Sequence, residues 1–377
     1  GGSLPNPTFA TRQFNGGVSY TVLANVDASI TEVVAPIQPV VGNNNLTVRV
    51  TNFGQTTITQ ADLSYRFNNG ATVSVNDAVF PFPIPIGGIY DYQFATPFVV
   101  PALGSYSIQA YVSDVNGAGP DIEQNNDTLS TNLCTPLSGN YTINSGTATG
   151  GVNFASFAEA INVLQSCGVS GPVVFDVANG VYLEQLVINE IAGTSSANTI
   201  TFKGNPSLVS TTILRHNVSS SFSNYVLSLE GADYLSFENL AFESLNSSLS
   251  RVIQITSGAE YNTIKGCRLI APVNYSSSSL NNALVYSSNS QDNYNTFLNN
   301  VLIGGSHGFY LNGEIAGSLP EVGNRIEGNE LINQSVYGIR SSITEGLKVI
   351  NNEMRTNSTN TSATYGFQFS RTNGAFE

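Results

Sequence analysis

The chain contains few positive charges. Only 13 of its 377 residues are Lys or Arg, and lysine occurs at just three positions, Lys203, Lys265 and Lys348. Because Asp and Glu number 26, the net charge is −13 and the isoelectric point is near 4.5. Binding to nucleic acid or to an anionic membrane surface requires clustered Lys and Arg. The composition therefore argues against both partners and fits a secreted acidic protein.

Long apolar segments are also missing. No apolar run reaches the roughly 18 residues that a membrane-spanning helix requires, so we expect no membrane insertion. The N-terminus shows no signal-peptide pattern. The chain opens mid-pattern at residues 1–3 and stops within a new repeat at 366–370. Because proteins normally cover an open sheet edge, we expect this chain to be a piece of a longer polypeptide.

Charged residues make up only 10% of the chain, against roughly 25% in typical soluble domains. Asn, Ser, Thr and Gly replace them, and in the C-terminal part they form a repeat. Five segments align, at 235–242, 262–269, 295–302, 324–331 and 347–354. Each has an apolar anchor, an Asn or Gly two positions later, and an apolar residue three positions beyond that. The anchors are Phe237, Ile264, Phe297, Ile326 and Val349.

A repeat of about 20–50 residues indicates a solenoid, and short alternating apolar runs separated by Asn, Gly and Ser favour strands over helices. The repeat suits one turn of a parallel β-helix, whose coils stack at about 4.8 Å. An inward Asn at a corner can bond both its own coil and the next one. We therefore predict an asparagine ladder of Asn300, Asn329 and Asn352, with Cys267 as a packing residue in the same position one coil earlier.

The N-terminal part has a different pattern. Residues 1–25 are predicted to be the end of a preceding module or a linker. Residues 26–133 contain seven short strand candidates separated by Asn- and Gly-rich turns, which is typical of an immunoglobulin-like β-sandwich. The candidates are 28–34, 46–51, 62–67, 71–75, 89–94, 105–112 and 128–132.

Residues 134–171 are predicted to form a junction with a capping helix, followed by the β-helix at 172–377, incomplete at its C-terminal end. Apolar residues at 154, 157, 158, 161 and 164 make a helical stripe. Ser156 is the expected N-cap, and Glu159 completes a capping box. Such a helix would plug the first coil.

Two resemblances cover nearly the whole chain. The pattern from Asn44 to Gly54, with Asn125-Asn-Asp-Thr128 near its end, resembles the CARDB-like adhesion modules of bacterial surface proteins. The capping helix followed by Asn-rich coils resembles the right-handed β-helices of pectate lyases and many surface proteins. Together they resemble the large secreted multidomain adhesins of Bacteroidota. This resemblance implies an all-β fold, an extracellular location at the cell surface, and partners among the other modules of the chain, glycans or cell-surface proteins.

Catalysis is a second hypothesis. Glu330 and Glu353 hold the same position in consecutive coils, so their Cα atoms should lie about 5 Å apart. Paired carboxylates can act as acid and nucleophile. However, Arg325 and Lys348 lie five residues before these two acids and should also be neighbours in adjacent coils. A solvated cluster of surface charges therefore explains the same pattern. Residues 305–308, Gly-Ser-His-Gly, are similar to the Gly-His-Gly of polygalacturonases, but the companion motifs of that family are missing.

Two groups of residues are candidate binding sites. His307, Tyr337 and Tyr365 each precede a glycine and an apolar strand start, so they could form a ladder that stacks on sugar rings, or a packing ladder at a coil corner. Asp114, Asn116 and Asp121 vaguely match the ligand pattern of a Ca²⁺-binding loop. The match ends at position 118, which is Ala, and no Glu that could bind the ion with both oxygens stands at the twelfth position of the loop. An ordinary polar hairpin loop is the alternative to a structural Ca²⁺ site, and no other cofactor is expected.

Cys134 and Cys167 bracket the junction, and the third cysteine belongs to the ladder. In an oxidising compartment the first two can form a disulfide; two separate buried thiols are the alternative. We therefore expect a non-catalytic segment of an extracellular adhesin or cell-surface filament, used for surface, cell or glycan attachment. A polysaccharide lyase or glycoside hydrolase and a purely structural spacer are the two alternatives.

Overall fold

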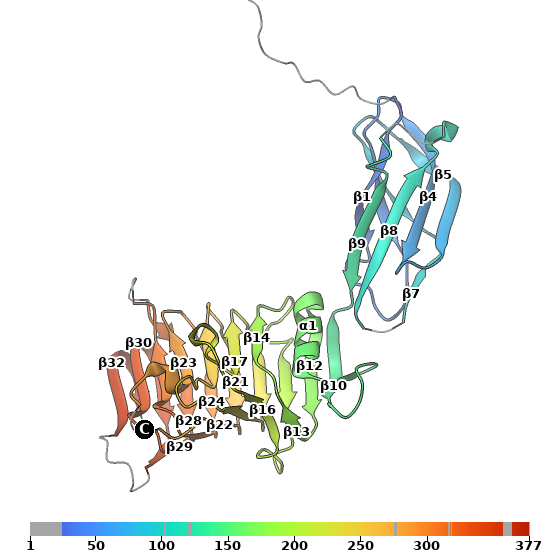
Figure 1. Cartoon of the computed structure of the whole chain (residues 1–377). Helices are drawn as coiled ribbons and strands as arrows, with labels where there is room; N and C mark the ends of the chain where they lie inside the picture. Colours follow the sequence, from blue (N-terminus) through green and yellow to red (C-terminus); the bar gives the residue numbers. More distant parts are fainter. Residues whose placement is uncertain are drawn as a thin grey trace, which may run out of the picture. The chain divides into compact units, whose positions relative to one another are not determined.

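We describe the protein from a computed structural model. It describes residues 25–101, 103–119, 123–274, 277–315, 317, 319–356 and 364–376. The predicted linker at 1–25 therefore lies almost entirely outside the described residues. Two compact units can be distinguished (Figure 1): a β-sandwich built from described residues up to 37, 44–98 and 106–133, and a unit that contains the β-helix from Cys134 onward together with residues 38–43 and 99–105. None of the described helices is long and apolar enough to cross a membrane.

The sandwich contains all seven predicted strands and two short ones that the sequence did not reveal. One antiparallel sheet has three strands, in the order β1 (Ala28–Ala35), β3 (Thr47–Asn52) and β6 (Ile89–Gln93). The other has four, in the order β5 (Thr72–Ile84), β4 (Ile58–Phe67), β8 (Ser105–Ser113) and β9 (Thr128–Cys134). The additional pair is β2 (Gly42–Asn44) with β7 (Phe98–Val100). Alternate residues of β3 and β4 are buried, as expected for strands with one face on a core.

The β-helix has three strands per coil and therefore three faces. The first face consists of β10 (Leu137–Ile143), β12 (Val169–Val177), β15 (Ile200–Lys203), β18 (Leu235–Glu238), β21 (Thr263–Lys265), β24 (Thr296–Leu298) and β28 (Arg325–Glu327). The second consists of β13 (Gly180–Tyr182), β16 (Thr212–His216), β19 (Ala241–Ser244), β22 (Arg268–Ile270), β25 (Val301–Ile303), β29 (Glu330–Ile332) and β31 (Glu353–Arg355).

The third face consists of β14 (Leu186–Asn189), β17 (Leu227–Glu230), β20 (Ile253–Thr256), β23 (Ala283–Ser288) and β26 (His307–Asn312). The long strand β30 (Tyr337–Ile350) pairs with β26 near its start and with β28 near its end, so it joins the first and third faces. The short strand β27 (Glu321–Val322) and the last strand β32 (Tyr365–Phe376) both pair with β30. All these pairings are parallel.

The register of the first face confirms the predicted repeat. Phe237 is the partner of Ile264, which is followed in successive coils by Phe297, Ile326 and Val349. All five anchors are buried. The same row continues toward the N-terminus as stacked rings, with Phe175, Phe202 and Phe237 at centroid distances of 4.9 and 5.1 Å. The predicted fold class, an immunoglobulin-like sandwich followed by a right-handed parallel β-helix with a capping helix, is confirmed.

The first strand of the stack lies earlier than the sequence suggested. Strand β10 pairs in parallel with β12, although its residues fall in the segment predicted as a junction. Leu137, Tyr141 and Ile143 alternate inward and are buried. The segment carries no Asn–Gly repeat, and for this reason the aligned motif did not reveal it.

Helix α1 (Phe157–Cys167) lies at this first end of the stack (Figure 1). Ser156 caps it by accepting a hydrogen bond from the Glu159 N–H at 3.2 Å. The Glu159 carboxylate bonds the N–H of Ala155, so it binds one residue before the position that a capping box predicts. Phe157, Ala160, Ile161, Leu164 and Cys167 are buried in the β-helix core, whereas Ala158, expected on the apolar stripe, is exposed.

Asparagine ladders stabilise two corners of the coils. At the predicted corner, Asn300 and Asn329 each accept the backbone N–H of the preceding coil, as does Asn352, all at 2.9 Å. Their amide groups also donate to backbone carbonyls of the coil before. Cys267 occupies the same position, and burial raises the pKa of its thiol to about 12.

A second ladder was not predicted. Asn262, Asn295 and Asn324 repeat the same bonding pattern at the corner before the first face. These residues open three of the aligned segments, so the signal was present in the sequence. The two ladders hold both ends of the short strands β24 and β28 on the first face.

Candidate functional site

The predicted aromatic ladder lies at the start of β26, β30 and β32. His307, Tyr337 and Tyr365 are register partners in consecutive coils. Their ring centroids are 5.3 and 5.2 Å apart. Tyr337 is therefore covered on both faces, by His307 and by Tyr365. Of the three residues, Tyr365 is 53% exposed and could stack on a sugar ring.

His307 cannot contact a glycan, because its side chain is only 1% exposed. Its Nδ1 lies 2.9 Å from the Ser306 hydroxyl, and its Nε2 is buried without a hydrogen-bond partner. Burial and the nearby positive charge of Arg340 lower the pKa of His307 to about 4. The imidazole is therefore neutral at physiological pH and serves as the inner end of the ladder.

A second row of side chains runs beside this ladder. Tyr286 and Tyr310 are register partners whose rings stack at 5.5 Å, and Arg340 is the next residue of the row. The Arg340 guanidinium carbon lies 5.5 Å from the ring centroids of both Tyr310 and Tyr337. We call the group formed by Tyr310, Tyr337, Arg340 and Tyr365 the Arg340 face.

Arg340 differs from three of the other six arginines of the β-helix. Arg215, Arg325 and Arg355 each form an ion pair with glutamate. Within the described parts of the chain, no carboxylate pairs with Arg340. A guanidinium presents a planar set of donors that matches a carboxylate or sulfate. Two flanking rings hold it by cation–π attraction, worth about 0.5–2 kcal/mol each, while its hydrogen-bonding capacity remains available.

A third aromatic group was missed at the sequence level. Tyr234, Tyr261 and Tyr294 stack in consecutive coils at the corner before the first face, with centroids 5.0 and 4.8 Å apart and planes within 2 and 9° of parallel. Tyr261 and Tyr294 are 42 and 43% exposed. All three have left-handed backbones, with φ of 60, 56 and 55°. Bulky residues rarely adopt this conformation, and the next coil has Gly323 at the equivalent place, with φ of 69°.

The tyrosine stack presents edges rather than faces. Neighbouring rings cover one another, and the Gly323 backbone lies so close to Tyr294 that an added Cβ would come within 2.5 Å of the ring. Asp233, Glu260 and Asn293 precede the three tyrosines and form their own row, in which Asp233 accepts the Glu260 N–H at 2.7 Å and Glu260 accepts the Asn293 amide at 2.6 Å. The exposed groups are phenol hydroxyls, ring edges and polar side chains.

The predicted acid pair does not have the properties of a catalytic pair. Glu330 and Glu353 are register partners, as expected. Arg355 lies between them, 3.1 Å from Glu330 and 2.9 Å from Glu353. Its hydrogen bonds and charge lower the pKa of Glu353, whereas a general acid needs a raised pKa. The two acids therefore form a solvated ion-pair cluster with Arg355, a partner that the sequence analysis did not identify. Arg325, which was expected to belong to this cluster, forms its ion pair with Glu327.

Two other acids are buried inside the last coils. Glu321 and Asp292 are each 1% exposed, and both contact the hydroxyl of Ser287. Burial, with the nearby charge of Asp292, raises the pKa of Glu321 to about 8. Because neither side chain reaches the surface, a polymer substrate cannot approach them. No motif in the sequence indicates this cluster, since Ser287, Asp292 and Glu321 all lie outside the aligned segments of the repeat.

The predicted calcium loop is only partly described, because Asp121 lies outside the described residues. The Asp114 carboxylate accepts the Gly119 N–H at 2.8 Å. Asn116 bonds the backbone of Thr57 and Thr59 at 2.9 and 2.8 Å. Asp114 therefore stabilises its own turn, and Asn116 connects this turn to the start of β4. Among the residues that the structure describes, no group of three or more His, Cys, Asp or Glu could hold a metal ion.

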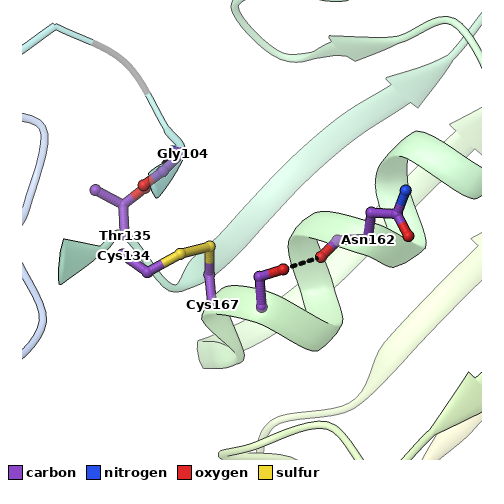
Figure 2. The surroundings of a disulfide bond; sticks show 6 residues. Gly104, Cys134, Thr135, Asn162 and Cys167 are labelled. Carbon is purple, nitrogen blue, oxygen red and sulfur yellow. Dashed lines mark hydrogen bonds between the residues drawn. A yellow bond between two sulfur atoms is a disulfide. The ribbon is translucent and has the colours of Figure 1, made fainter. Parts of the chain in front are cut away.

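The structure pairs Cys134 with Cys167 in a disulfide, with Cα atoms 5.1 Å apart (Figure 2). The bond connects the end of β9 to the last residue of α1. Thr135, the next residue, accepts the Gly104 N–H through its hydroxyl at 2.7 Å. The third cysteine, Cys267, is free and buried.

Comparison with known proteins indicates only similar architecture. No protein-family model and no curated protein matches this chain. Among solved structures, the CARDB domain of a Pyrococcus furiosus protein, solved with di-metal ions, is 17% identical and covers 31% of this chain and 94% of its own, with a TM-score of 0.23. The pectin methylesterase of Aspergillus niger is 14% identical over 64% of this chain and 87% of its own, with a TM-score of 0.36.

The family 28 exopolygalacturonase of Yersinia enterocolitica is 7% identical over 93% of this chain and 86% of its own, with a TM-score of 0.28. These similarities concern an immunoglobulin-like module and parallel β-helices. Because fold does not determine function, they assign neither a substrate nor an activity to this chain.

Proposed function

We propose that this chain is a non-catalytic attachment segment of an extracellular surface protein, an adhesin or a cell-surface filament, and that its β-helix binds glycans. The single observation that carries the proposal is the state of Arg340, which two tyrosine rings hold on the outside of the last coils without a carboxylate partner among the described residues. The ligand best suited to this face is a glycan that carries carboxylate or sulfate groups.

The arrangement of the acids supports binding rather than cleavage. The exposed pair Glu330 and Glu353 is neutralised by Arg355, and a second group, Asp292 and Glu321, has raised pKa values but is buried. A glycosidase requires two carboxyl groups that flank the scissile bond, one of them protonated. Neither acid group meets both conditions of access and protonation.

The binding test uses affinity electrophoresis of the chain through gels that contain acidic or neutral polysaccharides. Acidic polymers should retard the wild type, and Arg340→Gln should lose most of this retardation. Arg371→Gln is the matched control, because Arg371 is exposed in the neighbouring coil and makes no ring contact among the described residues. Equal retardation of the wild type and Arg340→Gln would refute the assignment of the site.

A second candidate function, a polysaccharide-active enzyme, is favoured by Asp233, a half-buried acid that contacts Glu260 and whose pKa is raised by burial. We expect no release of reducing ends or unsaturated uronates from a panel of polysaccharides. Release that disappears in Glu330→Gln, Glu353→Gln or Glu321→Gln would establish the enzyme instead. A chain that neither binds nor cleaves any polymer of the panel would be a structural spacer.

A further inference from the structure

Three buried polar side chains meet inside the last coils of the β-helix. Ser287 lies on β23, Asp292 in the loop that follows, and Glu321 on β27. Each is 1% exposed. The Ser287 hydroxyl oxygen lies 2.6 Å from Asp292 Oδ2 and is also within a hydrogen bond of Glu321 Oε1.

The number of hydrogens available decides the state of this group. A serine hydroxyl carries one hydrogen, and an ionised carboxylate carries none. If both acids were ionised, Ser287 could donate to only one of them, and the other contact would place two oxygens together without a hydrogen. The two contacts are satisfied together only when one of the acids is protonated.

The hydrogen bonds indicate which acid holds the proton. Asp292 accepts four donors, namely the Ser287 and Ser290 hydroxyls and the N–H groups of Gly258 and Ala259, at 2.6–3.2 Å. Several donors stabilise a carboxylate anion. Besides its contact with the Ser287 hydroxyl, Glu321 accepts fewer hydrogen bonds: one from the Asn324 amide, which lies 3.0 Å from Oε2, and one from the backbone of Asn312.

Among the described residues, no positively charged group acts on the Glu321 carboxyl. The titratable groups that act on its carboxyl from the neighbouring elements are Asp292 in the loop after β23 and Tyr310 on β26. On β30, the register partner Thr344 presents a hydroxyl that bonds Ser341 at 2.9 Å. An ionised Glu321 would therefore be a buried charge beside a second carboxylate, which is costly.

We propose that Glu321 is protonated in the folded protein and donates to Ser287, whose hydroxyl donates to ionised Asp292, and that loss of this proton at alkaline pH loosens the last coils. The burial that raises the pKa of Glu321 to about 8 agrees with this assignment. The hydrogen bonds from Glu321 to Ser287 and from Ser287 to Asp292 connect β23, the loop that follows it and β27, and they require the proton on Glu321. It is independent of the proposed binding function.

The sign of the pH effect follows from linkage. The ordinary pKa of Glu321 is 4.5, and the folded value is about 8. Between these values the folded state holds one more proton than the unfolded state, so stability is full below pH 4.5 and falls as pH rises to about 8. Over this window one proton makes the unfolding constant rise by up to about tenfold per pH unit.

The test is denaturant unfolding of the whole chain at pH values from about 5 to 9. The free energy of unfolding of the wild type should fall with rising pH. Glu321→Gln keeps the shape and neutrality of the protonated acid, so its free energy of unfolding should fall less steeply, by the contribution of about one proton per molecule. Glu345→Gln is the control. Glu345 is an exposed acid and the register partner of Val322, the residue after Glu321, and its replacement should leave the pH dependence of stability as in the wild type. A wild-type slope that Glu321→Gln leaves unchanged would overturn the proposal.

A measurement on the folded wild type makes the proposal independent of how well the variant folds. The infrared spectrum at neutral pH should contain the carbonyl band of a buried protonated carboxylic acid, and this band should vanish reversibly as pH is raised past about 8–9. Absence of the band at neutral pH would contradict a protonated Glu321.

Discussion

Replacing Asn329 with Ala tests how much the asparagine ladder contributes to the β-helix. Asn329 is 1% exposed. Its Oδ1 accepts the N–H and the side-chain amide of Asn300, and its Nδ2 donates to the Phe297 carbonyl and to Asn352 Oδ1, all within 2.9–3.0 Å. In the alanine variant the Asn300 N–H and the Phe297 carbonyl lose these partners, while the Asn300 amide keeps the Ile264 carbonyl.

Each buried polar group left without a partner costs about 1–3 kcal/mol, so we expect Asn329→Ala to lower the free energy of unfolding by about 2–6 kcal/mol. The assay is guanidinium-induced unfolding followed by circular dichroism, comparing midpoints at an unchanged slope. The control is Asn217→Ala, an exposed asparagine after β16, which should change stability by no more than about 0.5 kcal/mol.

A double-mutant cycle refines this test. Because Asn300 and Asn329 share two hydrogen bonds, the loss in the double alanine variant should fall short of the sum of the single losses by about 0.5–3 kcal/mol. Strict additivity, or a loss in Asn329→Ala no larger than in the control, would refute the ladder as a source of stability.

Three further predictions concern packing, backbone strain and the disulfide. Phe297→Ala removes a buried core ring and should cost about 3–5 kcal/mol in unfolding free energy, measured by the same denaturation. Tyr261→Gly should be more stable than Tyr261→Ala by about 1 kcal/mol, because both lose the ring stack but only glycine tolerates the left-handed backbone; the reverse order would show that the position is not strained. The bond between Cys134 and Cys167 closes a loop with a sequence separation of 33, so reduction should lower stability by about 3–4 kcal/mol in the chain-entropy model. Recovery of both cysteines as freely alkylated thiols in an unreduced digest of protein from its native cell surface would rule the bond out.

The sequence predicted those features that repeat at a constant offset. Phe237 and the other anchors lie 23–33 residues apart, but they could be aligned because each is followed by the same short motif. The Asn300 corner was visible for the same reason. Strand β10 was not visible, because its residues alternate correctly but lie before the first repeat of the motif.

The candidate binding residues were harder to predict, because they depend on contacts across coils. Tyr337 and Tyr365 were found through their position before a glycine. Arg340 was not, since nothing in its local sequence shows that it lies between two rings and lacks an acid. The buried state of His307 and the protonation of Glu321 depend on how completely the last coils close around them, which residue types alone do not determine.

The measurement that most directly tests the proposed function is quantitative binding of purified chain to an acidic and a neutral polysaccharide, at low and at moderate salt. The account predicts binding to the acidic polymer that weakens with salt, as expected for a charge pair at the surface, loss of most of that binding in Arg340→Gln, and full retention in Arg371→Gln. Equally tight binding to the acidic and the neutral polymer, or unchanged binding by Arg340→Gln, would contradict the proposed function.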